Sequence, residues 1–244
     1  EAHWVAKPGM NALVQQWAKP LQDAGELVLN TQVIRLEADK LHPERWQLQT
    51  KSPGDESHVY GGFDMVILAI PSPQAQALLL GSQQAKELQA ELARVTVAPC
   101  WTLMVAFPQA QQPTLCSLGP QWNVARSTHH RIAWLARESS KPGRGPIERW
   151  TIQANVEWSQ RHLEDDAERV KAKLLRGFTE ITGIHAEPPY AEVHRWRYAQ
   201  TSKPLGKTHV WDAQNGIGLC GDWCLGHRVE DGFVSGLEMA LAII

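Results

Sequence analysis

The stretch Ile217-Gly218-Leu219-Cys220-Gly221-Asp222-Trp223-Cys224 decides the fold, because it reads as a short apolar strand that runs into a Gly-Asp turn. After a loop, Arg228-Val229-Glu230-Asp231-Gly232 opens a helix. The first turn of a helix has N–H groups without intrahelical partners, which attract anions and polarised oxygen atoms. Asp222, at the end of the strand, is placed to accept hydrogen bonds from ligand hydroxyl groups. The same pattern also suits an ordinary strand–turn–helix corner.

Outward from this corner, hydrophobic periodicity predicts further helices and strands. Four helices are expected. The first begins after Pro8-Gly9-Met10 and is bent or ended by Pro20, and the second runs from a Ser82 cap to about Val95. The third runs from Glu164 to a stop at Gly183, and the last covers 232–244. Strands are expected at 27–37, 46–50, from 59, at 65–70, 98–107, 132–136, 150–156, 191–198 and 216–220. The Pro- and Gln-rich segment 108–120 is predicted to be a surface loop. This mixture predicts an α/β or α+β protein with a mixed sheet.

The composition excludes several classes of protein. A net charge of −2 and a pI of about 6.6 exclude a basic nucleic-acid-binding surface. The longest apolar run, Met65 to Ile70, is too short to span a membrane. The four cysteines have no zinc spacing, so we expect no metal site and reduced thiols in a cytoplasmic protein. Neither GxSxG nor HExxH occurs, which gives a hydrolase little support.

The corner at 221–224, together with Arg228-Val229-Glu230 and Ser235-Gly236-Leu237, resembles the C-terminal flavin motif of the FAD-dependent amine oxidase superfamily, and best its renalase-like bacterial branch. In that family the aspartate holds a ribityl hydroxyl group, and the following helix faces the pyrimidine side of the flavin. The resemblance implies FAD as cofactor. It places cofactor contacts at Gly221, Asp222, Trp223, Arg228, Val229, Glu230 and Gly232.

Other segments resemble the family in the same order along nearly the whole chain. Val33 stands where the family has an adenine-contacting residue, and Ala69 and Pro71 follow a strand whose end passes under the cofactor. Further likenesses are Trp134-Leu135-Ala136-Arg137, Glu157-Trp158-Ser159 and the strand around Trp196. The resemblance implies a partial FAD-binding domain over 1–75, a substrate domain over 76–205, and a C-terminal return to the FAD-binding domain over 206–244.

The sequence departs from the family at four points. It contains no strand followed by GxGxxG, so we expect roughly a hundred upstream residues, with the first βαβ unit, to be missing. Asp231 is an unusual charge in this motif, and it either caps the helix or changes the flavin potential. No lysine lies on the strand from Cys100 to Phe107, where many members have one, which argues against amine oxidation of the ordinary kind. There is no covalent-flavin cysteine motif, and Cys224 is expected to be a buried thiol.

The residues expected in catalysis are Trp196 and Tyr198, which share one face of their strand and would sandwich a flat or amine substrate, although core packing is an equal alternative.

Arg137, Lys141 and Arg144 form either a phosphate-attracting loop or a solvated one, and His129-His130 is expected on the surface. The resemblance implies hydride transfer from an amine or dihydronicotinamide-type small molecule to flavin N5, with O2 as oxidant. The alternative is a non-catalytic binding module that lost its dinucleotide-binding half.

Overall fold

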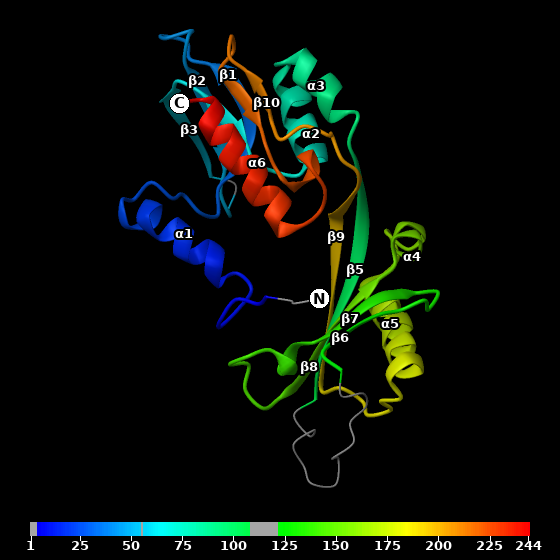
Figure 1. The fold of residues 1–244 in the computed structure, drawn as a ribbon. Coiled ribbons are helices and arrows are strands. Elements are labelled where there is room, and N and C mark those ends of the chain that lie inside the picture. The colour runs from blue at the N-terminus through cyan, green and yellow to red at the C-terminus, as the bar shows by residue number, and fades with distance from the viewer. Residues whose placement is uncertain (1–3, 55, 108–121) are drawn as a thin grey trace. The chain divides into compact units, whose positions relative to one another are not determined.

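The computed structural model describes residues 4–54, 56–107 and 122–244, and the expected loop at 108–120 lies outside them. The chain divides into two compact units (Figure 1). Unit 1 comprises Glu1–Leu27 and Pro99–Arg197, and unit 2 comprises Val28–Ala98 and Tyr198–Ile244. Helices and strands occur in both units, as the sequence predicted for a mixed fold. None of the helices in the described part of the chain is long and apolar enough to cross a membrane.

Unit 2 contains two small sheets. One is antiparallel, with the order β1 (Gln32–Ala38), β2 (Trp46–Lys51) and β3 (Ser57–Phe63). The other has the order β10 (Val210–Asp212), β11 (Ile217–Leu219) and β4 (Val66–Leu68), in which β11 and β4 run parallel. The helices are α2 (Ser72–Ser82), α3 (Lys86–Leu92) and α6 (Val229–Ala242). Buried side chains of the two sheets, of α2 and α3 and of the segment after β11 form one core, which includes Leu36, Leu79, Ile217, Leu219 and Trp223.

The helix expected from Ser82 to about Val95 forms only as α3 (Lys86–Leu92), and its predicted start at Ser82 is wrong. Pro71 and Pro73 do end the strand, but they also start α2, since proline suits the first turn of a helix. Ser82 is the last residue of α2, and Gln83 follows in the left-handed conformation. The buried Ser82 hydroxyl donates to the Leu78 carbonyl (2.7 Å) and accepts the Leu36 N–H (2.9 Å), which joins α2 to β1.

Replacing Ser82 by alanine is expected to destabilise unit 2 by about 1–3 kcal/mol, because the buried Leu36 N–H loses its acceptor. Urea titration of the variant, followed by circular dichroism, measures the change. Ser57→Ala, at an exposed position of β3, is the matched control. Equal midpoints for the two variants would show that the Ser82 bond contributes nothing to stability.

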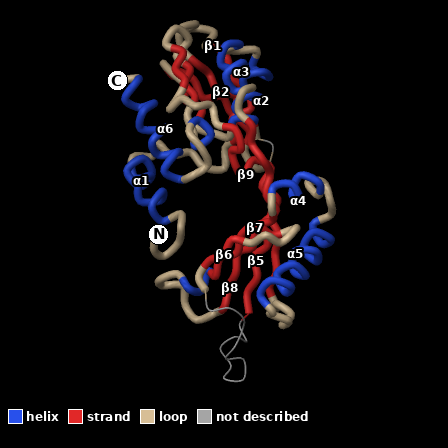
Figure 2. The backbone as a smooth tube through the Cα atoms, turned by 45° about the vertical axis from the view of Figure 1, so that its right-hand side comes forward, coloured by secondary structure: helices blue, strands red, loops and turns tan. Residues whose placement is uncertain are grey.

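Unit 1 contains most of a five-stranded sheet, with α4 (Val156–Arg161) and α5 (Ala167–Thr182) on one face (Figure 2). The strand order is β6 (Val124–Arg126), β7 (Ile132–Arg137), β8 (Glu148–Ala154), β5 (Thr96–Phe107) and β9 (Tyr190–Lys203). A 3₁₀ turn, η3 (Glu138–Ser140), follows β7. The chain passes between the units within β5 and β9, because a unit boundary falls inside each of these strands.

The core of unit 1 lies between the sheet and its two helices. It includes Phe178 of α5, together with Trp101 and Leu103 of β5 and Trp150 and Ile152 of β8. These four strand residues are two apart in sequence, which is the alternation of a half-buried strand. α5 ends at Gly183 as predicted, in the left-handed conformation, but it begins at Ala167 and not at Glu164, because Asp166 caps it by accepting the N–H groups of Glu168 and Arg169.

One prediction in unit 1 needs correction, and one of the two alternatives for Pro20, that it ends the helix, is excluded. Val156 starts α4 and does not extend the strand, because the Asn155 side chain caps this short helix through the Trp158 N–H. α1 (Ala12–Asp23) continues for three residues beyond Pro20, and none of its residues is buried. The apolar side chains of Leu13 and Val14 are therefore largely exposed.

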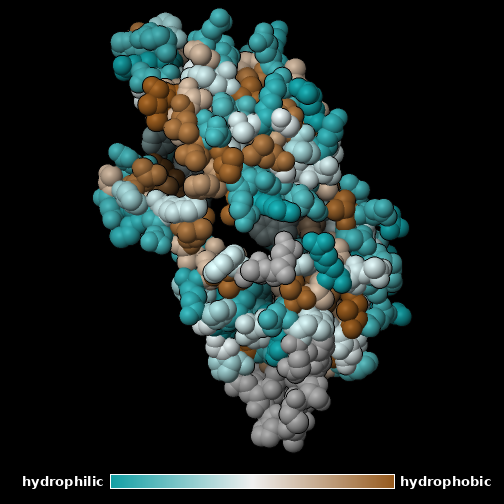
Figure 3. Space-filling view, in the orientation of Figure 1, coloured by the Kyte–Doolittle hydropathy of each residue, from teal (hydrophilic) through white to brown (hydrophobic). Residues whose placement is uncertain are grey.

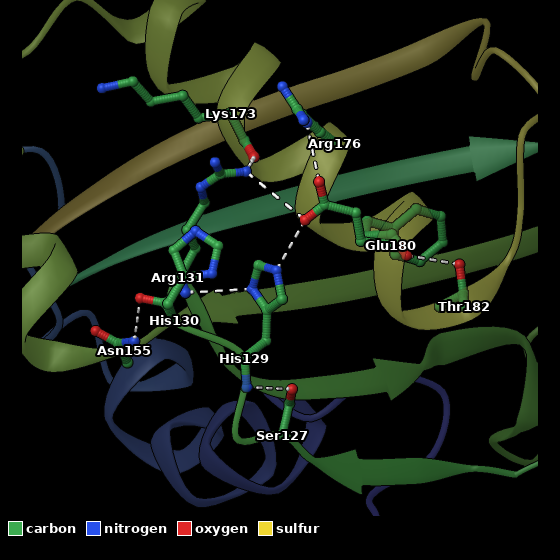
Figure 4. A network of polar contacts seen from close by, with 10 residues as sticks. Ser127, His129, His130, Arg131, Asn155, Lys173, Arg176, Glu180 and Thr182 are labelled. Atoms are coloured by element: carbon green, nitrogen blue, oxygen red, sulfur yellow. Dashed lines mark hydrogen bonds and ion pairs between the residues drawn. The ribbon is translucent and has the colours of Figure 1, made fainter.

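His129 is also placed differently from the expectation, since its side chain is only 15% exposed, whereas His130 is exposed. The Arg131 N–H donates to His129 Nδ1 (3.2 Å), so the ring proton is on Nε2 and is donated to Glu180 (2.9 Å). Arg176 holds the other oxygen of Glu180 (2.9 Å; Figure 4). This network fastens the loop between β6 and β7 to α5.

Candidate functional site

The strand–turn–helix corner forms in unit 2 as the sequence predicted. β11 ends at Leu219, a 3₁₀ turn, η4 (Asp222–Cys224), follows Gly221, and α6 begins at Val229. The Gly221 N–H donates to the buried Ser235 hydroxyl (2.9 Å). This bond holds the turn against the second turn of α6.

Asp222 presents a free carboxylate at this corner. Its side chain is partly exposed, and it accepts no hydrogen bond from any residue that the structure describes. A Cβ on Gly232 would lie 3.8 Å from the Asp222 Cβ, so the aspartate lies beside the first turn of α6. An unused carboxylate next to a helix N-terminus offers acceptors and donors together, which suits a ligand with hydroxyl and carbonyl groups.

Asp231 caps α6, which was one of the two alternatives for this residue. Its Oδ2 accepts the N–H groups of His227 (3.0 Å) and Arg228 (2.9 Å). The N–H groups of Val229 and Glu230, in the first turn, have no intrahelical acceptor because of the geometry of a helix. The N–H groups of Val229 and Glu230 therefore remain available to a ligand, although the Asp231 carboxylate lies in the same first turn of α6.

Trp223 is buried in the core of unit 2, with 1% of its surface exposed. Its indole N–H donates to the Ile70 carbonyl (3.0 Å), which ties the corner to the segment that follows β4. Ala69 and Pro71 flank this carbonyl, so the structure brings these two predicted residues next to the corner. A direct contact between Trp223 and a cofactor stays a prediction.

Gly221 is required because of Trp223. A Cβ at this position would lie 2.5 Å from Trp223 Nε1 and 2.8 Å from Cδ1. We expect Gly221→Ala to displace the indole from Ile70 and to destabilise unit 2 by about 1–3 kcal/mol. The thermal unfolding midpoint measures this effect, and Gly236→Ala, where no atom lies within 4 Å of the added methyl group, is the control. A normal midpoint for Gly221→Ala would exclude the steric role.

The two cysteines of the corner are buried thiols. Burial raises the pKa of Cys220, and it raises the pKa of Cys224 to about 11. Neither is a thiolate near neutral pH, so neither is a good nucleophile. This agrees with the expectation that Cys224 is a buried thiol.

A groove of about 1110 Å³ lies within unit 2. It is lined along one side by 30–34 and along another by 66–70, so Val33 and Ala69 face the same space. Ligand pockets usually measure about 300–1,000 Å³, which makes this groove large enough for a dinucleotide-sized molecule. Ile70, whose carbonyl accepts the Trp223 N–H, also lines it, whereas none of the residues 221–232 does.

β4 borders the groove and has an open edge. Among the described residues its only partner strand is β11, so the backbone groups on its other edge are free to pair. Parallel strands are normally covered on both sides.

α6 exposes apolar side chains, among them Val229, Phe233, Leu237 and Leu241, and Figure 3 shows apolar side chains gathered over this helix.

The predicted catalytic residues lie on β9, with Trp196 in unit 1 and Tyr198 in unit 2. Both are exposed, at 52% and 42%. The alternative of core packing therefore does not hold for them. The Trp196 ring lies 4.2 Å from the His194 ring, centroid to centroid. Their catalytic role stays a prediction.

Sequence reasoning missed a row of residues on the sheet of unit 1. Strand register places Trp134 opposite Gln153, and Gln153 opposite Thr102. All three point away from the core that α4 and α5 cover, because their neighbours Leu135, Ile152 and Leu103 point into it. Alternation along each strand was visible in the sequence, but the register between strands was not.

The basic loop is neutralised by acidic partners. Arg137 binds Glu148 through two bonds (2.7 and 2.9 Å), and Lys141 binds Glu138 (2.7 Å). Arg144 lies 3.9 Å from the same Glu138. This pairing leaves little charge for a phosphate group. The described residues contain no cluster of histidine, cysteine and carboxylate side chains that could hold a metal ion.

Comparison with known proteins places these features in a family. The fold is similar to that of a protein described as a protoporphyrinogen oxidase from Exiguobacterium sp. 255-15, with a TM-score of 0.68 at 19% identity. It is also similar to cyclohexylamine oxidase from Brevibacterium oxydans IH-35A, with a TM-score of 0.65 at 14% identity. Each match covers 96% of this chain but only 51% and 52% of the other, so the chain spans about half their length.

The family model for flavin-containing amine oxidoreductases matches residues 1–244, the entire chain. The resemblance read from the corner at 221–232 is thereby confirmed for the superfamily, and with it the mixed fold of FAD-dependent amine oxidases. The chain therefore belongs to the flavin-containing amine oxidoreductases, and FAD, the cofactor expected from the sequence, is the cofactor of its family.

Proposed function

We propose that the protein is an FAD-dependent oxidoreductase of the renalase-like kind, which oxidises a small amine or dihydronicotinamide-type molecule with O2 as the final oxidant. The observation that carries this proposal is the Asp222 carboxylate, unused within the described fold, at the N-terminus of α6, in the unit that also holds a groove of about 1110 Å³. FAD, when bound, supplies the hydride acceptor at N5. The protein's own residues supply binding, orientation and electrostatics.

The chain offers suitable groups for each part of the cofactor. Asp222 would accept hydrogen bonds from hydroxyl groups of the ribityl chain, and the N–H groups at the start of α6 would donate to carbonyl oxygens. Arg228, Glu230 and Gly232 belong to this turn through their backbone. Val33 and Ala69 line the groove, where they would contact the adenosine half. Trp196 and Tyr198 would flank the substrate.

The open edge of β4 supports the view that the pyrophosphate is held by a further βαβ unit. Such a unit would pair with β4 as a parallel strand, on this polypeptide or on another. Its glycine-rich turn would supply the phosphate-binding N–H groups that this sequence lacks. On this proposal 1–75 and 206–244 serve the cofactor, and 76–205 serves the substrate. A cytoplasmic location is part of the proposal and is supported by the free thiols of Cys100, Cys220 and Cys224.

The test is a visible absorption spectrum after incubation with FAD and removal of free flavin. Two proteins are compared: this chain, and the same chain preceded by a strand–GxGxxG–helix unit of its family. Flavin retained by the extended form supports the proposal. If neither form retains flavin, the proposal fails, and a non-catalytic binding module takes its place.

A further inference from the structure

A buried serine of α6 holds both ends of the turn that carries Asp222. The Ser235 side chain is completely buried, and its hydroxyl oxygen accepts the Gly221 N–H (2.9 Å). Burial raises the pKa of the Cys224 thiol to about 11, and a hydrogen bond with the Ser235 side chain opposes this rise. The same hydroxyl group therefore reaches the first and the last residue of the segment 221–224. We call this pair of contacts the serine clamp.

Other described hydrogen bonds of the turn set its shape. The Asp222 carbonyl accepts the N–H groups of Leu225 (2.9 Å) and Gly226 (2.7 Å), and both bonds stay within the turn and the residues directly after it. The Trp223 carbonyl accepts the Leu205 N–H (3.1 Å), which leads to the segment between β9 and β10. The serine clamp is different, because it joins the turn to α6.

The place of the turn on α6 decides where the Asp222 carboxylate lies relative to the start of that helix. A Cβ on Gly232 would lie 3.8 Å from the Asp222 Cβ, so the aspartate is beside the first turn, and Ser235 lies in the next turn. A ligand binds the carboxylate and the first N–H groups together only if both stay within about 3.2 Å of its atoms. A displacement of the turn by about 1 Å is enough to lose one of these contacts.

We propose that Ser235 is a positioning residue for the cofactor, which holds the Asp222 carboxylate beside the first N–H groups of α6 so that one ligand binds both. A serine hydroxyl can accept the Gly221 N–H and donate to the Cys224 sulfur at the same time, which an alanine side chain cannot. Because this hydroxyl is completely buried, it acts on a ligand through Asp222 and not by direct contact. The inference rests on the proposed function and names a residue that sets the FAD affinity of the corner.

The first experiment measures the dissociation constant for FAD by flavin fluorescence, in the form of the protein that retains FAD. Ser235→Ala should weaken binding by about tenfold, which corresponds to about 1.4 kcal/mol. Ser159→Ala is the matched control, because Ser159 is equally buried on α4 and accepts the Trp101 N–H (3.1 Å). This control should lose stability but keep the affinity of the parent protein. Ser235→Thr, which keeps the hydroxyl group, should recover most of the affinity.

A double-mutant cycle separates positioning from a general loss of structure. In the Asp222→Ala background the carboxylate that Ser235 holds is absent, so Ser235→Ala should change the affinity by less than about twofold. The proposal is overturned if Ser235→Ala still weakens binding about tenfold in that background. It is also overturned if Ser159→Ala weakens binding as much as Ser235→Ala does.

Hydrogen exchange of this chain without FAD, followed by NMR, tests the serine clamp independently of the cofactor. Loss of the acceptor in Ser235→Ala should speed exchange of the Gly221 amide by about tenfold, whereas Ser159→Ala should leave it unchanged. Unchanged exchange in Ser235→Ala overturns the proposal even if FAD binds. If neither form of the protein retains flavin, the proposed function fails, but faster exchange still supports the clamp, so the two failures are distinguishable.

Discussion

Replacing Glu148 by glutamine is expected to destabilise unit 1 by about 3 kcal/mol. Glu148 is 7% exposed, and its carboxylate holds the Arg137 guanidinium with two bonds, at 2.7 and 2.9 Å. The Glu148 side chain raises the pKa of Arg137 through this hydrogen bond, so the guanidinium stays charged. Glutamine has nearly the same shape but leaves a mostly buried cation without a counter-ion. The midpoint of urea unfolding, followed by tryptophan fluorescence, measures the loss.

Glu168→Gln is the control, because Glu168 is 74% exposed in its pair with Lys171. An exposed pair of this kind contributes about 0–1 kcal/mol, so the control should unfold close to the parent protein. The double variant Arg137→Met with Glu148→Gln should regain part of the loss, because no buried charge is left. A shift for Glu148→Gln no larger than that for Glu168→Gln would mean that solvent already screens the pair.

Replacing Asp222 by alanine is expected to weaken flavin binding by about 10- to 100-fold, because hydrogen bonds to a charged group contribute about 1.5–3 kcal/mol. The Asp222 side chain contributes to no described hydrogen bond of the fold, so the variant should remain folded. The dissociation constant is measured by flavin fluorescence in the form of the protein that retains FAD. The unfolding midpoint of the variant is a second readout, because a purely structural role of Asp222 would lower it.

Asp64→Ala is the matched control, since the Asp64 carboxylate is 79% exposed and lies 3.4 Å from Arg45. Flavin affinity in this control should equal that of the parent protein. If Asp222→Ala binds FAD as tightly as Asp64→Ala, then the free carboxylate at the corner does not contact the cofactor. The assignment of Asp222 would then fail even though the family membership stands.

Local signals in the sequence predicted much of the fold. Gly183 indicated the end of α5, and alternating apolar residues marked β5 and β8, because caps and side-chain periodicity depend on residues close in sequence. The errors came where two local signals competed. Pro71 and Pro73 follow the strand expected at 65–70, but prolines at the first turn also start a helix, and α2 was not predicted there. Ser82, a good capping residue, instead accepts a bond from Leu36, 46 residues away.

The sequence by itself determined the family, the cofactor and the strand–turn–helix corner, because these depend on an ordered set of short motifs around Gly221 and Asp222. Only the tertiary structure decided what surrounds them. It placed the Ile70 carbonyl on Trp223, 153 residues apart in sequence, and it aligned Trp134, Gln153 and Thr102 across three strands. Alternation tells which face a residue takes, but pairing register is set by turns and long-range packing, which no short window of sequence contains.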